Sequence, residues 1–197
     1  MDKVIILGGG AHCRSVLESV ICSKCFEPVG IIDPKFKADE PAILSVNFLD
    51  NKKPLLQYRK EGIEHAVIGV GSKGDNTVRA RLFKEAKAAG FTLPVIRHKT
   101  AYVSSFSKIG TGTQLMANSV VNSNSELGSN CVLNSLSVVE HDCLLKDNIF
   151  TGPGVVICGG TTIGSNSFLG ANATVVPDMV LPPETFLRAN SLYHKKP

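Results

Sequence analysis

Residues 121–145 read VNSNSELGSNCVLNSLSVVEHDCLL, with an aliphatic side chain at every sixth position: Val121, Leu127, Leu133, Val139 and Leu145. An α-helix repeats about every 3.6 residues and a β-strand every two, so a period of six fits neither element. A fixed period longer than a single element's own repeat indicates a chain that stacks short units into coils. This stretch therefore decides the fold of the C-terminal half.

The same period continues in both directions from this stretch. Its fifteen members are aliphatic except for Thr151, and they are Val103, Ile109, Leu115, Val121, Leu127, Leu133, Val139, Leu145, Thr151, Ile157, Ile163, Leu169, Val175, Leu181 and Leu187. The residue two positions earlier is mostly small, and the residue just after is often Gly or Asn, which tolerate the positive φ of a tight corner. This is the hexapeptide repeat of a parallel β-helix.

Three hexapeptides build one triangular coil of 18 residues, so fifteen repeats predict five coils. Each coil leaves an apolar face that only the next coil covers, and several coils must therefore stack. Hexapeptide helices of this type wind left-handed, against the right-handed rule for parallel crossovers. We predict a left-handed parallel β-helix.

The first hundred residues alternate between short apolar runs and helical patterns. Strands are expected at Lys3–Leu7, Val29–Ile32 and Ala66–Val70, and helices at about 12–23 and 76–89. This alternation is typical of a parallel sheet with crossover helices, a small Rossmann-like unit. We predict an α/β domain over residues 1–97 and a β-helix domain with a C-terminal tail over residues 98–197.

Three loops follow the expected strands at the sheet edge where open parallel sheets bind ligands. In the first, Gly8-Gly9-Gly10, free N–H groups at a helix N-terminus suit a phosphate. A simple tight turn is the equal alternative, because position 13 is Cys and the G-x-G-x-x-G spacing is incomplete. Asp33 either bonds a ribose hydroxyl or ends its strand in a turn. The candidate substrate-binding residues of these loops are Gly8, Gly10, His12, Asp33, Pro34, Lys35, Gly69 and Gly71.

The net charge of +4 is unevenly distributed. Residues 1–98 carry 15 Lys or Arg and 11 Asp or Glu, residues 99–187 carry 3 and 6, and residues 188–197 carry 3 and 0. The chain lacks the basic runs with interleaved aromatic residues of nucleic-acid binders, and a small anionic ligand such as a nucleotide diphosphate fits better. We recognise no signal peptide or membrane-length apolar run, and the six scattered Cys fit a reducing compartment, so we expect a cytoplasmic protein.

One histidine, His141, lies within the repeats, in Glu140-His141-Asp142-Cys143. It follows the inward Val139 by two residues, so its side chain is expected to face outward at a corner. An ordinary surface histidine is the simpler interpretation, but two neighbours favour catalysis. Asp142 is placed to assist the imidazole. Gly159, one coil later, is expected directly above it, with a backbone N–H that suits an oxyanion. A single histidine does not supply the three ligands of a γ-carbonic-anhydrase-type site, and we predict no metal.

On these residues the chain resembles the bacterial sugar acyltransferases that join a Rossmann-like domain to a left-handed β-helix. They include nucleotide-amino-sugar N-acetyltransferases and sialic-acid O-acetyltransferases. The resemblance covers nearly the whole chain and rests on Ile-Leu-Gly-Gly-Gly-Ala-His at 6–12, Ile31-Ile32-Asp33, Ile68-Gly69-Val70-Gly71 followed by Arg79, Arg97-His98-Lys99-Thr100-Ala101, Glu140-His141-Asp142-Cys143 and Gly159-Gly160-Thr161-Thr162-Ile163-Gly164.

The resemblance implies a homotrimer that holds acetyl-CoA in the groove between neighbouring β-helices and a nucleotide-linked sugar on the N-terminal domain. It implies His141 as the catalytic histidine, Asp142 as its acidic neighbour and Gly159 as the backbone donor beside the thioester. Asn134 matches an asparagine near the site. The residues matched to the acetyl-CoA path are Phe150, Gly159, Gly160, Ala171 and Ala189.

The chain departs from this family at two places. Many relatives carry a second histidine nine residues after the first, where this chain has Phe150. Relatives also tend to end in Gly-x-Pro-Ala, where this chain reads Leu187-Arg188-Ala189-Asn190-Ser191-Leu192. Both departures bear on the contacts with acetyl-CoA.

We predict acetyl transfer from acetyl-CoA to the 4-amino group of a nucleotide-linked amino-deoxy sugar, with UDP as the expected carrier. The acceptor is expected to attack the thioester directly, because Cys131 and Cys143 occupy inward positions. His141, with an ordinary pKa of about 6.5, takes the acceptor's proton. Two alternatives stay open: O-acetylation of a sialic-acid-like sugar, and a non-catalytic trimeric binder of sugar nucleotides. We expect no nucleic-acid partner and no membrane insertion.

Overall fold

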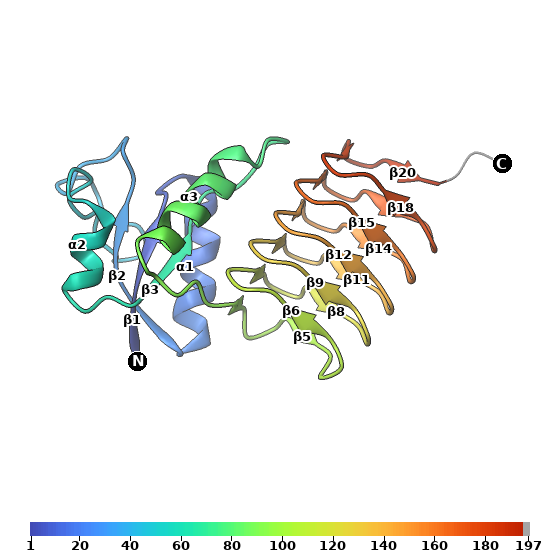
Figure 1. The fold of residues 1–197 in the computed structure, drawn as a ribbon, viewed down its shortest axis with the longest axis horizontal. Coiled ribbons are helices and arrows are strands. Elements are labelled where there is room, and N and C mark those ends of the chain that lie inside the picture. The colour runs from blue at the N-terminus through green and yellow to red at the C-terminus, as the bar shows by residue number, and fades with distance from the viewer. Residues whose placement is uncertain (195–197) are drawn as a thin grey trace.

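The computed structural model describes residues 1–194. It consists of an α/β domain followed by a parallel β-solenoid, which is the left-handed β-helix predicted from the repeat. Figure 1 shows the N-terminal domain at one end of an elongated molecule, with the coils stacked away from it toward the C-terminus. None of the described helices is both long and apolar enough to cross a membrane.

The N-terminal domain holds three parallel strands in the order β2-β1-β3. Its elements are β1 (Asp2–Leu7), α1 (Ala11–Ser23), β2 (Phe26–Ile32), α2 (Leu55–Lys60), β3 (His65–Ile68) and α3 (Thr77–Ala88). The sequence predicted every one of these except α2, because six residues are too few to show a helical period. The domain division at residue 97 stays a prediction.

Strand β1 is the centre of this sheet and is covered on both faces. Val4 and Ile6 pack on one side, in the cluster that contains Val16 of α1. Ile5 and Leu7 pack on the other, in the cluster that contains Phe83 of α3. A parallel strand covered on both faces needs a continuous apolar run, and this is why the sequence shows four buried apolar residues in a row there.

The solenoid is built from two-residue strands in three parallel sheets of six, six and five strands. The covered face consists of β4 (Ile96–Arg97), β7 (Gln114–Leu115), β10 (Val132–Leu133), β13 (Phe150–Thr151), β16 (Phe168–Leu169) and β19 (Phe186–Leu187). The open face consists of β5 (Tyr102–Val103), β8 (Val120–Val121), β11 (Val138–Val139), β14 (Val156–Ile157), β17 (Thr174–Val175) and β20 (Leu192–Tyr193). The charged face consists of β6 (Lys108–Ile109), β9 (Glu126–Leu127), β12 (Leu144–Leu145), β15 (Thr162–Ile163) and β18 (Val180–Leu181). Strands β4 and β20 extend the fifteen-member repeat by one strand at each end.

The second residue of each strand from β5 to β19 points inward, as the period predicts. Leu133, Val139 and Leu145 are fully buried in one continuous core that runs the length of the solenoid. Small residues fill the inner corners, where Ser125 donates its hydroxyl to the Glu140 carbonyl. The solenoid therefore has an aliphatic axis, while two buried corner atoms, Ser119 Oγ and Asn130 Oδ1, have no partner among the described residues.

The N-terminal domain lies on the covered face of the solenoid. Gln114 on β7 donates its side-chain amide to the Ile68 carbonyl at the end of β3, at 2.7 Å. His12 of α1 meets Phe150 of β13 edge to face, with ring centroids 5.7 Å apart. The corner between the open and charged faces, which carries His141, is opposite this covered face. We call that corner the His141 edge.

Two further corners complete the triangular section. The alanine edge, between the covered and open faces, carries Ala117, Ser135, Pro153, Ala171 and Ala189. The asparagine edge, between the charged and covered faces, carries Asn130, Asn148 and Asn166, whose side-chain amides are linked in series. Both edges border the covered face, and the His141 edge does not.

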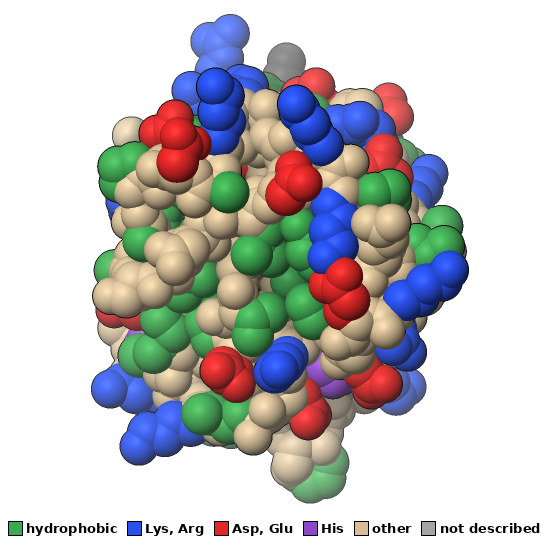
Figure 2. Space-filling model, turned by 90° about the vertical axis from the view of Figure 1, so that its left-hand side faces the viewer, with side chains coloured by type: hydrophobic (Ala, Val, Ile, Leu, Met, Phe, Trp, Pro, Cys, Tyr) green, Lys and Arg blue, Asp and Glu red, His purple; other side chains and the backbone are tan. Residues whose placement is uncertain are grey.

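Charged side chains of both signs are interspersed on the end of the molecule formed by the N-terminal domain, as Figure 2 shows. No extended patch of one sign is visible on this face. The excess of basic residues counted in the sequence is therefore diluted by neighbouring acidic groups at this end.

Leu145→Ala should lower the free energy of unfolding by about 2–5 kcal/mol, because it removes three carbons from the solenoid axis and leaves a cavity. Leu144→Ala on the same strand is the matched control, since Leu144 points outward and is partly exposed, and it should cost less than half as much. Urea unfolding of both variants measures the difference. Equal losses would contradict the inward assignment of the repeat.

Candidate active site

His141 stands on a corner turn whose backbone is set by the next residue. Asp142 adopts the left-handed conformation with φ 59°, as does Asn124 one coil below, also at φ 59°. Gly160 occupies the same position one coil above, at φ 71°. Because these turns repeat at 18 residues, the side chains along the His141 edge are stacked in register.

The imidazole of His141 is held by its acidic neighbour. Its Nδ1 lies 2.7 Å from Oδ2 of Asp142, while the other oxygen, Oδ1, accepts a hydrogen bond from the Asn124 side chain at 2.6 Å. The His141 side chain is 65% exposed, and none of residues 1–194 bonds its Nε2. The geometry fixes the ring through Nδ1 and presents Nε2 to solvent, which suits a proton acceptor.

Carboxylates around His141 favour its charged form. The hydrogen bond to Asp142 raises the pKa of His141 most, desolvation opposes it, and the charges of Asp142, Glu140 and Asp178 raise the pKa further. The pKa of Asp142 is lowered in turn by its hydrogen bonds from Asn124 and His141. The corner thus carries an electronegative surface centred on the histidine.

Gly159 lies directly above His141, where the 18-residue period predicts it. A Cβ on Gly159 would sit 2.6 Å from Cε1 and 2.8 Å from Nε2 of the imidazole, closer than any carbon tolerates. Within the described part of the chain the Gly159 N–H donates no hydrogen bond, although its carbonyl accepts one from the Asp178 N–H. Glycine is therefore required here for the ring to pack, and its N–H is left for a ligand.

The two glycine loops of the N-terminal domain pack against each other. The Gly8 N–H donates to the Ile32 carbonyl at 2.8 Å, and a Cβ on Gly69 would sit 2.2 Å from the Gly8 oxygen. Gly10 differs, because a Cβ there meets nothing within 4 Å and its φ of −74° suits any residue. The space beside Gly10, at the N-terminus of α1, is open to a ligand.

Asp33 ties two of these loops together through its carboxylate. Oδ2 accepts from the Gly9 N–H at 2.7 Å and Oδ1 from the Lys35 N–H at 2.8 Å. This is the turn interpretation of Asp33-Pro34, and it also shows that one amide of the glycine run is already bonded within the protein. A ribose contact at Asp33 stays a prediction.

His12 is mostly buried between Gly71 and Phe150. Burial, with the nearby charge of Arg79, lowers its pKa to about 4, so the imidazole is neutral at pH 7. Its Nε2 has no hydrogen-bond partner among the described residues. A neutral His12 serves this region as a hydrogen-bonding group and not as a charge.

Comparisons with known proteins match this arrangement along the whole chain. The PglD N-terminal domain family matches residues 3–86, and the bacterial transferase hexapeptide family (six repeats) matches residues 142–177. A mutant of perosamine N-acetyltransferase from Caulobacter crescentus, solved in complex with CoA and GDP-perosamine, is 29% identical with a TM-score of 0.91, over 100% of this chain and 90% of the other. The acetyltransferase domain of PglB from Neisseria gonorrhoeae is 26% identical with a TM-score of 0.89, over 98% and 92% of the two chains.

The chain is an acyltransferase whose N-terminal domain and solenoid match these two families. The prediction of an enzyme is confirmed, and the alternative of a non-catalytic binder is set aside. Among the described residues of this acyltransferase, no group of three or more His, Cys, Asp or Glu side chains is arranged to hold a metal ion.

Phe150 of the acyltransferase is 6% exposed on the covered face, between His12 and Phe168, and away from the His141 edge of the same chain. Asn134 lies at the alanine edge, where its side chain donates to the Thr151 carbonyl at 2.7 Å. One chain therefore does not bring either residue beside His141. The contact of Phe150 with acetyl-CoA and the role of Asn134 in substrate binding stay predictions.

The other matched residues divide between two corners. Gly160 lies on the His141 edge beneath Asp178, whose Oδ1 would be 2.2 Å from a Cβ there. Ala171 and Ala189 lie on the alanine edge, at the opposite side of the open face. One chain does not place these alanines beside His141, so any groove that contains all of them needs two chains.

The sequence analysis missed the residues that orient this site. Asn124 stands one coil below Asp142, and Asp178 stands two coils above it. Both could have been found by counting in steps of 18 residues from Asp142. Asn76 and Gln114, which join the domains, left no periodic signal because their partners are in the other domain. Arg79 left none because its partners, Ile68 and Val70, are at the end of β3 and in the loop after it.

Asp142→Asn should lower the pKa of His141, since the hydrogen bond from the imidazole to the carboxylate is the largest cause of the raised pKa. Asp178→Asn removes only a more distant charge and should lower that pKa by less. Titration of the imidazole resonances by NMR measures both midpoints. An unchanged His141 midpoint in the Asp142→Asn variant would show that the pair does not form in solution.

Proposed function

We propose that the acyltransferase moves an acetyl group from acetyl-CoA to the 4-amino group of a nucleotide-linked amino-deoxy sugar. The observation that carries this proposal is the His141 edge, where an imidazole oriented by Asp142 lies under the Gly159 amide. Relatives at 29% and 25% identity were solved with CoA and GDP-perosamine and with acetyl coenzyme A, respectively. UDP is the carrier expected from the sequence, and GDP is the carrier in the perosamine relative.

In the proposed mechanism, His141 acts as general base through Nε2. It removes a proton from the acceptor nitrogen as that nitrogen attacks the thioester carbonyl of the donor. The Gly159 N–H donates to the carbonyl oxygen as it becomes negative, an interaction of a kind that contributes about 2.7–4 kcal/mol to transition-state stabilisation. His141 then returns the proton to the departing thiolate. An acceptor that arrives as an ammonium group first loses its extra proton to solvent.

A direct transfer agrees with the state of the nearby thiols. Cys143 lies behind His141 on the inside of the corner, and burial raises its pKa. Burial likewise raises the pKa of Cys131 to about 12. Buried, protonated thiols are poor nucleophiles, so an acyl-enzyme on either residue is disfavoured.

The electrostatics favour an amine over a hydroxyl acceptor. Glu140, Asp142 and Asp178 surround His141 with negative charge, which attracts an ammonium group and has no such effect on a neutral hydroxyl. O-acetylation of a sialic-acid-like sugar is the second candidate and is tested by the same assay.

The complete site requires a second copy of the chain. The loops that suit the sugar nucleotide lie on the covered face, and His141 lies on the opposite edge. The open face between them presents the outward side chains Tyr102, Val120, Val138, Val156, Thr174 and Leu192. We propose that this apolar face packs in a cyclic trimer, bringing the His141 edge of one copy beside the alanine edge and glycine loops of the next.

His141→Ala should reduce thiol release from acetyl-CoA by about 10²–10⁴-fold with UDP- or GDP-linked 4-amino-4,6-dideoxy sugars, because the general base is lost. CoA binding and circular dichroism should be unchanged, since the side chain is exposed. Ser105→Ala, an exposed change on the same edge, is the control. A fully active His141→Ala variant would overturn the role of the base, and release only with sialic acids would favour O-acetylation.

Mixing two inactive variants tests the shared site. Gly10→Phe keeps His141 but fills the open space at the glycine loop, whereas His141→Ala keeps the loop. Random mixing of the two after refolding should restore about a quarter of wild-type turnover, because one site in four then pairs an intact histidine with an intact loop. Mixtures as inactive as their parents would show that each site is built within one chain.

A further inference from the structure

Arg79 is a fully buried cation at the junction of the two domains. It is the third residue of α3 and is 1% exposed. No acidic side chain forms an ion pair with it anywhere in residues 1–194. Desolvation lowers its pKa to about 9, which leaves it charged at pH 7. A buried charge without a counterion destabilises a fold, so its retention calls for another reason.

The guanidinium holds the backbone at the end of β3. Its Nη1 donates to the Val70 carbonyl at 2.8 Å and to the Ile68 carbonyl at 3.3 Å. The Ile68 carbonyl has a second donor in Gln114, whereas Arg79 is the one donor to Val70 found within the described chain. Loss of Arg79 would therefore free the Val70 peptide in particular.

Val70 stands at the centre of both glycine loops. It lies between Gly69 and Gly71, and a Cβ on Gly8 would sit 2.3 Å from its Cγ2 atom. Gly71 in turn lies against His12. A change in the Val70 peptide is thus transmitted to Gly8 and His12 through direct packing.

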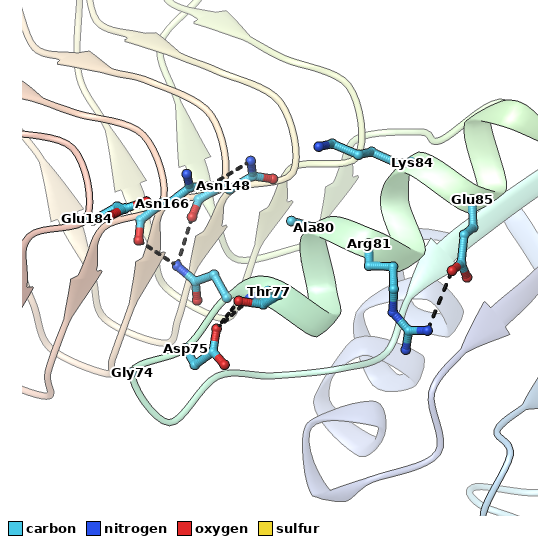
Figure 3. A pocket seen from close by; sticks show the side chains of 11 residues that line it. Gly74, Asp75, Thr77, Ala80, Arg81, Lys84, Glu85, Asn148, Asn166 and Glu184 are labelled. Carbon is cyan, nitrogen blue, oxygen red and sulfur yellow. Dashed lines mark hydrogen bonds and ion pairs between the residues drawn. The ribbon is translucent and has the colours of Figure 1, made fainter.

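The far end of the same loop is fixed separately. Asn76 donates its side-chain amide to the carbonyls of Asn148 at 2.9 Å and Ser167 at 3.1 Å. Figure 3 shows the chain passing from Gly74 into α3 beside the asparagine edge, across a groove of about 820 Å³. Because Asn76 anchors the loop to the solenoid, Arg79 is not needed to dock the domain.

We propose that Arg79 is a positioning residue for the acceptor: it sets the Val70 peptide and, through it, the two glycine loops that receive the nucleotide diphosphate. This rests on the proposed function for the identity of the ligand. Two of its nitrogens, Nε and Nη2, have no partner among the described residues, so burial of this charged side chain destabilises the fold. The hydrogen bond to the Val70 carbonyl is the reason that we infer for its presence.

Arg79→Met tests this directly, because methionine fills similar space without the charge or the donor. The variant should bind UDP and GDP at least about tenfold more weakly, in line with the loss of a hydrogen bond from a charged group. Its KM for acetyl-CoA should be unchanged, and its Tm should be equal to or above that of the wild type, since a buried unpaired charge has been removed. Arg79→Lys retains one donor and should fall between the two.

Arg81→Met on the same helix is the matched control, because Arg81 is exposed and pairs only with Glu85. It should bind both nucleotides as the wild type does.

Nucleotide affinity measured by calorimetry is independent of turnover. A wild type that binds UDP or GDP but releases no thiol would therefore overturn the proposed acetyl transfer and leave the positioning role of Arg79 standing. Wild-type nucleotide affinity in Arg79→Met would overturn the positioning role. If Arg79→Met does not fold, wild-type nucleotide affinity in Arg79→Lys would overturn the positioning role.

Discussion

The structure depends on the hydrogen-bond ladder that stacks each coil on the one before it. Pairs such as Val138 with Val156 place residues 18 apart directly above one another. The ladder works only if each corner closes in the same way, and left-handed turns at Asn124, Asp142 and Gly160 do so. A rigid one-dimensional register follows, and it converts distances along the sequence into distances along an edge.

The geometry of the candidate active site is a consequence of that register. His141 and Gly159 meet because they are one coil apart, and Asn124 reaches Asp142 for the same reason. None of these side chains needs a loop of its own to be positioned. A site built on a stacked scaffold is held within a narrow range, as catalysis requires, while its residues stay on the surface where substrates arrive.

The second feature on which the structure depends is the packing of the N-terminal domain on the covered face of the solenoid. This leaves the apolar open face uncovered and puts the acceptor loops opposite the histidine of the same chain. The junction is polar through Gln114 and Asn76, while Arg79 bonds the end of β3 within the N-terminal domain. Domain packing and the setting of the glycine loops are thus parts of one structure, and under the proposed function the complete site forms only between copies of the chain.

The amino-acid sequence by itself determined the coils, their length, the inward residues and the outward position of His141 beneath Gly159, because a strict period leaves one way to stack. It also determined the parallel sheet, from four consecutive buried residues in β1. Only the tertiary structure decided which face the N-terminal domain covers, and so that Phe150 is buried and that Ala171 lies on a different edge from His141. It also showed Asp33 joining two loops through Gly9 and Lys35, and a buried Arg79 holding Val70. The covered face and the Asp33–Gly9 contact bring together residues far apart in the sequence, and the Arg79–Val70 contact depends on how α3 packs on the end of β3. No local period or spacing encodes such contacts.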